Sequence, residues 1–167
     1  MPTAAAFATA TLVAAVVSAS LPCYLYGAWL VLRVPYVTWR VLVRHLSFIA
    51  VGLVLTTVPV LAWMVPRLLG HLDGLLAVHA FIGLQGYALL VFALTGIVHI
   101  FQVKREHDLY HEPDPDVELS TLHEDMDAWR FRLRVGVFGY LGCWLLAWLL
   151  GLARYVVVYH PLAHLGG

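Results

Sequence analysis

The chain has 167 residues, of which 62% are hydrophobic and only 12% are charged, and its formal net charge is zero. Soluble domains contain about half apolar and about a quarter charged residues, so this chain has too little polar surface to coat a water-soluble globule. A neutral total gives no reason to expect nucleic-acid binding, which requires a basic face. We therefore expect a single all-α integral membrane domain over residues 1–167, with the lipid bilayer as its first partner.

Four apolar segments are long enough to cross a bilayer, since about 20 helical residues span its hydrocarbon. They cover about residues 4–32, 42–65, 74–102 and 133–159. The first segment has no Lys or Arg before it and is too long for the apolar part of a signal peptide, so we expect an uncleaved first helix. Pro22 and Pro59 fall inside the first two segments, where membrane helices tolerate a kink.

The basic residues predict the orientation, because Lys and Arg accumulate on the cytoplasmic side. Only Arg67 and Arg154 belong to one side. The other side carries eight: Arg33, Arg40, Arg44, Lys104, Arg105, Arg130, Arg132 and Arg134. This asymmetry predicts a multi-pass protein of the cell (plasma) membrane with both termini outside and a cytoplasmic loop at about residues 104–132.

The long loop between the third and fourth segments is acidic. Nine of the ten acidic residues lie from Glu106 to Asp127, and the basic residues are nine Arg and one Lys, a composition that suits a salt-loving host. Thr121 and Glu124 have the spacing of a capping box, which predicts that the fourth helix begins there.

Two pairs in this loop have a spacing that could place them on one helix face. These are His107 with His111 and His123 with Asp127, each four residues apart. No Cys supports either pair as a metal site, and a solvated acidic loop is the simpler interpretation. We expect no metal, and a basic patch on a partner protein is the alternative ligand.

Histidines at matching depths raise the possibility of haem b, which needs two imidazoles at one depth on different helices. His45 lies about one turn inside the second segment, and His99 about one turn before the inner end of the third. His79 with His160 is the reserve pair, weakened because Pro161 ends the helix at His160. The alternatives are histidines that bind backbone, headgroups or a partner subunit, and a proton-path or quinone contact. We expect no cofactor, with haem b as the alternative.

The fourth segment carries a ladder of small residues, which lets another helix approach closely in lipid. At four-residue spacing stand Gly139, Cys143, Ala147 and Gly151. We expect this face to pack in the bundle or against a neighbouring subunit, and the opposite face, with Trp144 and Trp148, to face lipid.

Three stretches carry a resemblance to a known family. They are the run from His79 to His99, the residues Phe101 to His111, and the residues Trp129 to Tyr140. Together they resemble a small haloarchaeal four-helix membrane family of unassigned function, of the kind encoded beside cytochrome b and Rieske-type respiratory proteins. The resemblance covers nearly the whole chain and implies an electron-transport setting, but it implies no ligand residues.

Two functions remain open. The sequence contains no G-x-S-x-G, no P-loop, no thiol pair and no carboxylate inside a span, so it gives no support for an enzyme. In the setting that the resemblance implies, we expect a non-catalytic accessory or assembly subunit of a membrane electron-transport complex, in contact with other membrane subunits. The alternative is a haem b electron carrier with bis-histidine ligation. No small-molecule substrate is indicated.

The orientation gives a first testable prediction. A cysteine in place of Glu118 should be protected from a membrane-impermeant thiol reagent in intact cells, because the acidic loop is expected in the cytoplasm. Cys23 and Cys143 lie inside apolar segments, and the labelling of these two residues in the wild type is the background signal. Ready labelling at position 118 before the cells are opened would reverse the orientation without changing the number of spans.

Overall fold

The computed structural model describes residues 3–70, 74–114 and 117–160, and over these ranges the chain forms helices and no strand. The helices are α1 (Ala4–Leu32), α2 (Trp39–Pro59), α3 (Val65–Gly70), α4 (Gly74–Glu106) and α5 (Met126–Tyr159). A π-helical turn, Val60–Met64, joins α2 to α3, and a 3-10 turn, Leu119–Thr121, precedes α5.

Four helices of the described ranges are long and apolar enough to cross a membrane, which confirms the expected all-helical class. They are Ala4–Leu32, Trp39–Leu68, Gly74–Glu106 and Met126–Tyr159. The second of these combines α2, the π-helical turn and most of α3, because the helical path continues through Pro59. Proline removes one backbone hydrogen bond, and the wider turn directly after it re-pairs the local amide groups.

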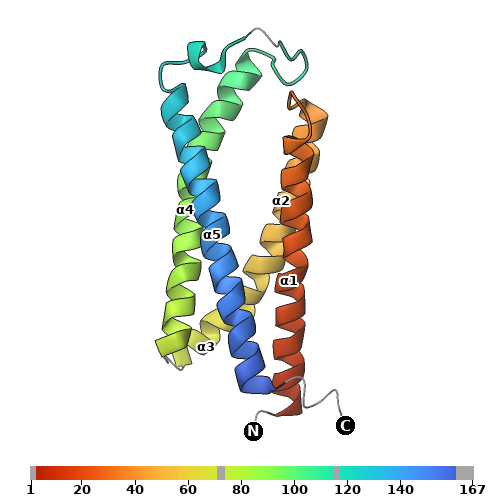
Figure 1. The fold of residues 1–167 in the computed structure, drawn as a ribbon, viewed down its shortest axis with the longest axis vertical. Helices are drawn as coiled ribbons and strands as arrows, with labels where there is room; N and C mark the ends of the chain where they lie inside the picture. The colour runs from red at the N-terminus through yellow and green to blue at the C-terminus, as the bar shows by residue number, and fades with distance from the viewer. Residues whose placement is uncertain (1–2, 71–73, 115–116, 161–167) are drawn as a thin grey trace.

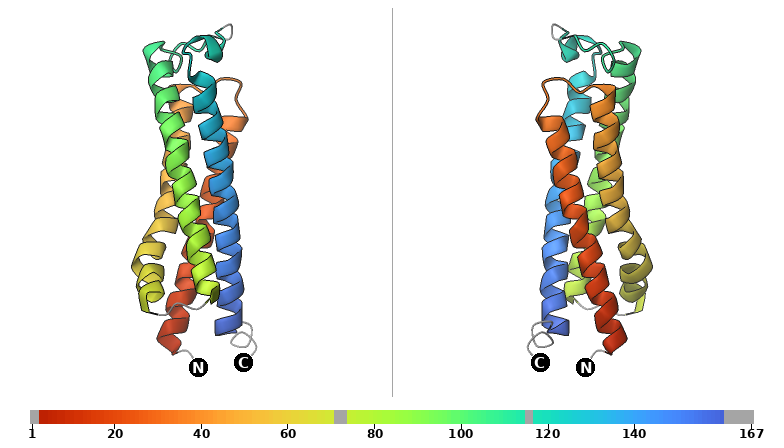
Figure 2. Two further views of the ribbon diagram at one scale, coloured as in Figure 1. Left: turned by 90° about the vertical axis from the view of Figure 1, so that its left-hand side faces the viewer. Right: turned by 90° about the vertical axis from the view of Figure 1, so that its right-hand side faces the viewer.

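The helices form two antiparallel pairs, α1 with α2 and α4 with α5 (Figure 1). Each pair lies side by side in one of the two turned views (Figure 2), and α1 with α5 provides the main contact between the pairs. The start of α1 and the end of α5 lie at one end of the molecule, and the loop between α4 and α5 covers the other end (Figure 1).

Glycines allow the close approach of helices within each pair. In the first pair, a Cβ built on Gly52 would lie 2.7 Å from Cε1 of Tyr24. In the second pair, a Cβ on Gly136 would lie 2.6 Å from both the Cβ and the backbone nitrogen of Ala93, and Gly96 approaches the backbone oxygen of Trp129 as closely. Small residues at these crossings give the van der Waals contact that holds helices together in lipid.

The loop between α4 and α5 is attached to the bundle rather than only solvated. Met126 is fully buried and packs with Val103 and Trp129, and the backbone amide of Trp39 donates to the carbonyl oxygen of Tyr110 at 2.9 Å. Burial of Tyr110 also raises the pKa of its hydroxyl above the usual value. The loop thus connects α2 to the α4–α5 pair at this end.

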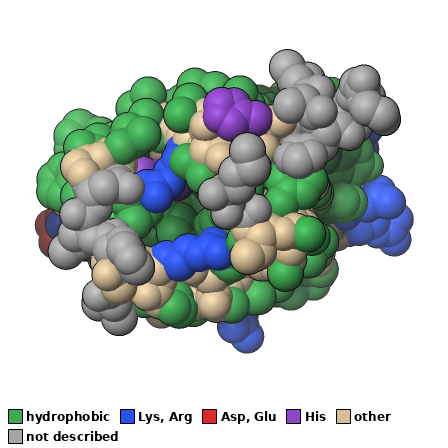
Figure 3. Space-filling view, turned by 90° about the horizontal axis from the view of Figure 1, so that it is seen from below, with side chains coloured by type: hydrophobic (Ala, Val, Ile, Leu, Met, Phe, Trp, Pro, Cys, Tyr) green, Lys and Arg blue, Asp and Glu red, His purple; other side chains and the backbone are tan. Residues whose placement is uncertain are grey.

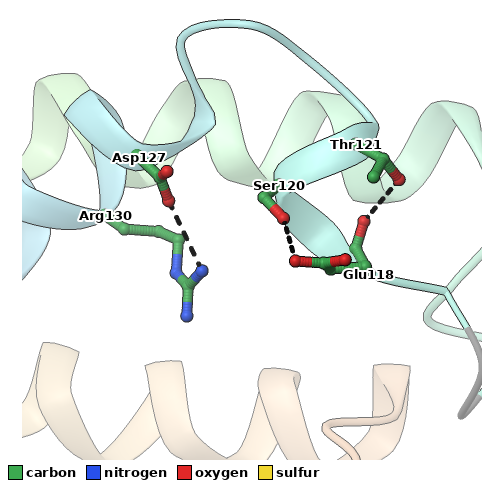
Figure 4. Close-up of polar contacts among 5 residues, drawn as sticks. All are labelled: Glu118, Ser120, Thr121, Asp127 and Arg130. Carbon is green, nitrogen blue, oxygen red and sulfur yellow. Dashed lines mark hydrogen bonds and ion pairs between the residues drawn. The ribbon is translucent and has the colours of Figure 1, made fainter.

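The capping box predicted at Thr121 and Glu124 is wrong. The Thr121 hydroxyl donates to the carbonyl oxygen of Glu118 at 2.7 Å, within the 3-10 turn (Figure 4), and α5 begins later, at Met126 with Asp125 as its N-cap residue. In the same region Arg130 pairs with Asp127 at 3.6 Å, one turn apart on α5 (Figure 4). Because its hydroxyl is bonded to a carbonyl oxygen of this turn, Thr121 does not cap the helix.

The glycines of α5 give a graded test. Gly136→Leu should destabilise the bundle by about 1–3 kcal/mol, because the new side chain meets backbone atoms of α4 that cannot move aside. Gly139→Leu should cost less, since its Cβ would meet Cδ1 of Leu89, a flexible side chain, at 2.9 Å. Thermal unfolding in a mild detergent measures both effects.

Gly142→Leu is the matched control, because nothing lies within 4 Å of a Cβ at this position. Its melting temperature should equal that of the wild type or rise slightly, since leucine forms helices better than glycine. Equal losses at positions 136 and 142 would contradict the close crossing of α4 and α5.

Candidate functional site

A cavity of about 640 Å³ lies between the helices, in the half of the bundle where α1 begins and α5 ends. Residues of α1, of α2 with its continuation into α3, of α4 and of α5 all contribute to its wall. Along α5 it extends from Tyr140 to Tyr159, which is about 28 Å at the rise of an α-helix. Aliphatic and aromatic side chains form most of its surface.

A network of hydrogen bonds closes the cavity near the middle of the bundle. The Thr56 hydroxyl donates to Ser20 at 3.1 Å, accepts from Nε1 of Trp144 at 3.4 Å, and lies 3.3 Å from the hydroxyl of Tyr24. The hydroxyls of Tyr24 and Tyr140 are 3.0 Å apart. Because no water reaches such a depth in a bilayer, these polar groups must satisfy one another.

The prediction that Trp144 and Trp148 face lipid is wrong. Trp144 is only 7% exposed and belongs to the central cluster with Tyr24 and Tyr140. Trp148 donates from Nε1 to the Ser18 hydroxyl at 3.0 Å, and its ring stacks on that of Trp144 at 6.0 Å. The indole N–H groups need acceptors inside the membrane, and the hydroxyls of α1 and α2 supply them.

Polar and basic groups gather at the end of the cavity farthest from the Thr56 network, which is called the wide end below. The guanidinium carbon of Arg67 lies 3.9 Å from the ring centre of Trp63, and Arg154 lines the cavity from α5. Seen from this end, basic side chains border a hollow between apolar ones (Figure 3). His79 also lines the wall, with Cε1 3.2 Å from a Cβ built on Gly151.

Trp63 carries a polar group that the described residues leave unpaired. Its Nε1 is buried and has no hydrogen-bond partner among the described residues, although the residue lines the cavity. A buried donor without a partner costs about 1–3 kcal/mol, so such groups are rare unless a site uses them.

One side of the cavity is bordered by exposed apolar side chains. Leu61 on the α2 side and Phe81 and Leu84 on α4 line the cavity, yet they are 62%, 62% and 66% exposed. On the opposite side the hydroxyls of Thr11 and Tyr155 hydrogen-bond at 2.7 Å and join α1 to α5. The two sides of the cavity therefore differ, because the side between α1 and α5 is closed by a hydrogen bond.

The structure gives each histidine of the predicted haem pair a separate partner. Nδ1 of His45 lies 2.8 Å from the carbonyl oxygen of Gly27 on α1. His99 is exposed on α4, and its ring stacks on Trp129 of α5 with centres 4.8 Å apart. Of the reserve pair, His79 lies in the cavity wall, whereas His160 is exposed at the end of α5 with a left-handed φ of 44°.

The small-residue ladder of α5 lies along α4. A Cβ on Gly139 would meet Leu89 at 2.9 Å, and a Cβ on Gly86 would lie 3.3 Å from the Cβ of Cys143. The other two members of the ladder, Ala147 and Gly151, line the cavity. The tightest crossings, at Gly136 and Gly96, were missed because neither belongs to a regular four-residue repeat.

The loop histidines each have a local partner. Nδ1 of His107 lies 2.9 Å from the carbonyl oxygen of Val103, and His111 pairs with Asp108 at 2.7 Å. The ring of His123 packs on Trp129 at 4.4 Å. Within the described part of the chain, no three His, Cys, Asp or Glu side chains converge on a position where a metal could bind.

Comparison with known proteins identifies the family. The chain belongs to the family described as Domain of unknown function (DUF7321), whose model matches residues 6–160. No curated protein and no solved structure matches the chain. The matched range includes all but the first two residues of α1, the whole of the other three long helices, and every residue named above in the cavity wall.

Proposed function

We propose that this member of the DUF7321 family is a non-catalytic membrane protein that holds an amphiphilic molecule from the bilayer between its four helices. The cavity is the single observation that carries the proposal. Its volume of about 640 Å³ falls in the usual range for ligand sites, and its wall combines a large apolar surface with a few polar groups, as such sites do. The exposed side between α2 and α4 gives a bilayer molecule a path to it.

A binding role fits the chemistry of the wall better than catalysis. The described residues that line the cavity include no carboxylate and no cysteine. Carboxylates and thiols are common general acids, bases and nucleophiles, and the Thr56 and Tyr140 hydroxyls of the wall are bonded within the central network. His79, the histidine in the wall, lies against Gly151.

We further propose that the protein is an accessory or assembly subunit of a membrane electron-transport complex. The resemblance to a family encoded beside cytochrome b and Rieske-type proteins supports this setting. The outward apolar faces of the helices are compatible with a neighbouring subunit as well as with lipid. Co-purification of a tagged copy from its native membrane, with the redox subunits identified by mass spectrometry, tests it.

Cavity filling tests the binding role. Gly83→Leu should place a side chain inside the cavity, because Gly83 lines it and nothing lies within 4 Å of a Cβ there. Protein purified in mild detergent should retain about one lipophilic molecule per chain by native mass spectrometry, and the variant should retain several-fold less. Gly142→Leu adds the same side chain in open space outside the cavity wall and should retain it fully. Equal retention by both variants, or no bound molecule in the wild type, would sink the proposal.

Haem b is the second candidate, and one observation favours it. The Nδ1 of His45 contacts a backbone carbonyl oxygen, which is how proteins orient an imidazole that binds metal through Nε2. The stacking of His99 on Trp129 works against it, because that ring would have to leave its present partner.

A pyridine haemochrome assay on the wild type, His45→Ala and His99→Ala decides this question. We expect no stoichiometric haem. Haem in the wild type that is lost in both variants would establish the alternative. Haem that both variants retain, and that a third variant, His79→Ala, loses, would place the haem at the other end of the bundle.

A further inference from the structure

We propose that the molecule held in the cavity is an anionic phospholipid, with one hydrocarbon chain inside the cavity and its phosphate at the wide end, beside Arg67, Arg154 and Trp63. This inference rests on the proposed binding role and specifies the class of ligand. Three features carry it: the length and apolar wall of the cavity, the distribution of charge, and an arginine held at the wall by an aromatic ring.

The shape of the cavity matches a single chain. The cavity extends along about 28 Å of the α5 axis, so an extended hydrocarbon chain can lie along it. The wall from Val13 and Val17 on α1 to Leu152 on α5 is apolar, as a chain requires.

The charge at the wide end favours an anion. Arg67 and Arg154 line the cavity, and Asp73, outside the described residues, is the one acidic residue that the sequence assigns to this side of the membrane. The other nine acidic residues lie from Glu106 to Asp127, at the opposite end of the bundle. Two arginines against one acid leave this end positive before any histidine is counted. Guanidinium groups bind phosphate through paired hydrogen bonds, and a positive end repels the choline cation of a zwitterionic headgroup.

An arginine held by an aromatic ring lies at the same end. Arg67 lies 3.9 Å over the ring of Trp63, which holds the guanidinium next to the indole. Both residues line the cavity. The guanidinium is therefore held at the wall, where a phosphate in the cavity can contact it.

The orientation agrees with that of a lipid already in the membrane. Arg67 lies in the short helix α3 and Arg154 in the last turns of α5, whereas the Thr56 network lies near the middle of the bundle. A lipid of that leaflet would therefore move sideways past Leu61, Phe81 and Leu84 without turning over. No extraction from the bilayer is needed.

The test compares headgroups at equal chain length. The full chain, purified in detergent, receives an equimolar mixture of phosphatidylglycerol and phosphatidylcholine, and native mass spectrometry measures which lipid is retained. We expect the wild type to retain about tenfold more phosphatidylglycerol, because phosphatidylcholine carries a choline cation beside the same phosphate and the arginines repel that cation. The double variant Arg67→Gln, Arg154→Gln should retain both lipids equally. Arg134→Gln, at the opposite end of the bundle, should keep the wild-type preference.

Three results would overturn the inference. They are equal retention of both lipids by the wild type, an unchanged preference in the double variant, and inorganic phosphate that raises the melting temperature as much as the anionic lipid does. The last result would assign the site to a free anion. If the double variant does not assemble, Arg67→Gln alone and Trp63→Phe replace it, and each should lower the preference several-fold.

The failure of this inference and the failure of the proposed function are distinguishable. Loss of all bound lipid in Gly83→Leu together with equal retention of the two headgroups keeps the binding role and removes the anion. A wild type that retains no lipid of either kind removes both.

Discussion

Inside a bilayer, lipid tails are as apolar as leucine, so burial of hydrophobic surface does not draw helices together. The two helix pairs of this protein must therefore be joined by close packing and by hydrogen bonds, and the hydroxyl of Thr56 is the centre of the latter. It connects α2 to Ser20 and Tyr24 of α1 and to Trp144 of α5. Most of the arrangement described above follows from where this network forms.

The cavity is one such consequence. On one side of the bundle α1 and α5 are joined above and below it, by the central network and by the hydrogen bond between Thr11 and Tyr155. On the other side Thr57 and Tyr87 hydrogen-bond at 2.8 Å and join α2 to α4, and beyond them the exposed Leu61 and Phe81 border the cavity. The cavity thus has one side that hydrogen bonds close and one side that exposed apolar residues border. The basic residues lie at the end of the cavity away from the central network.

Part of this could be predicted from the sequence and part could not. The four spans followed from the length of their apolar segments, which is a local property. The partners of Trp144 and Trp148 did not, because the acceptors Thr56 and Ser18 belong to other helices and nothing in a single segment indicates which face will meet them. The predicted start of α5 was wrong for the opposite reason, because a local contact decided it. The Thr121 hydroxyl donates to the carbonyl oxygen of Glu118 in a turn and does not cap the helix. The cavity was beyond prediction, because it depends on how far the two pairs diverge.

The π-helical turn Val60–Met64 has a consequence for every residue after it. Such a turn acts as a one-residue insertion and rotates the following helical face by about 100° relative to an uninterrupted helix. Arg67 and Leu68, which follow the turn, line the cavity on this rotated face. In an uninterrupted helix the same residues would point about a quarter turn away, so the angular phase introduced after Pro59 decides whether the basic end of the span faces the interior or the membrane.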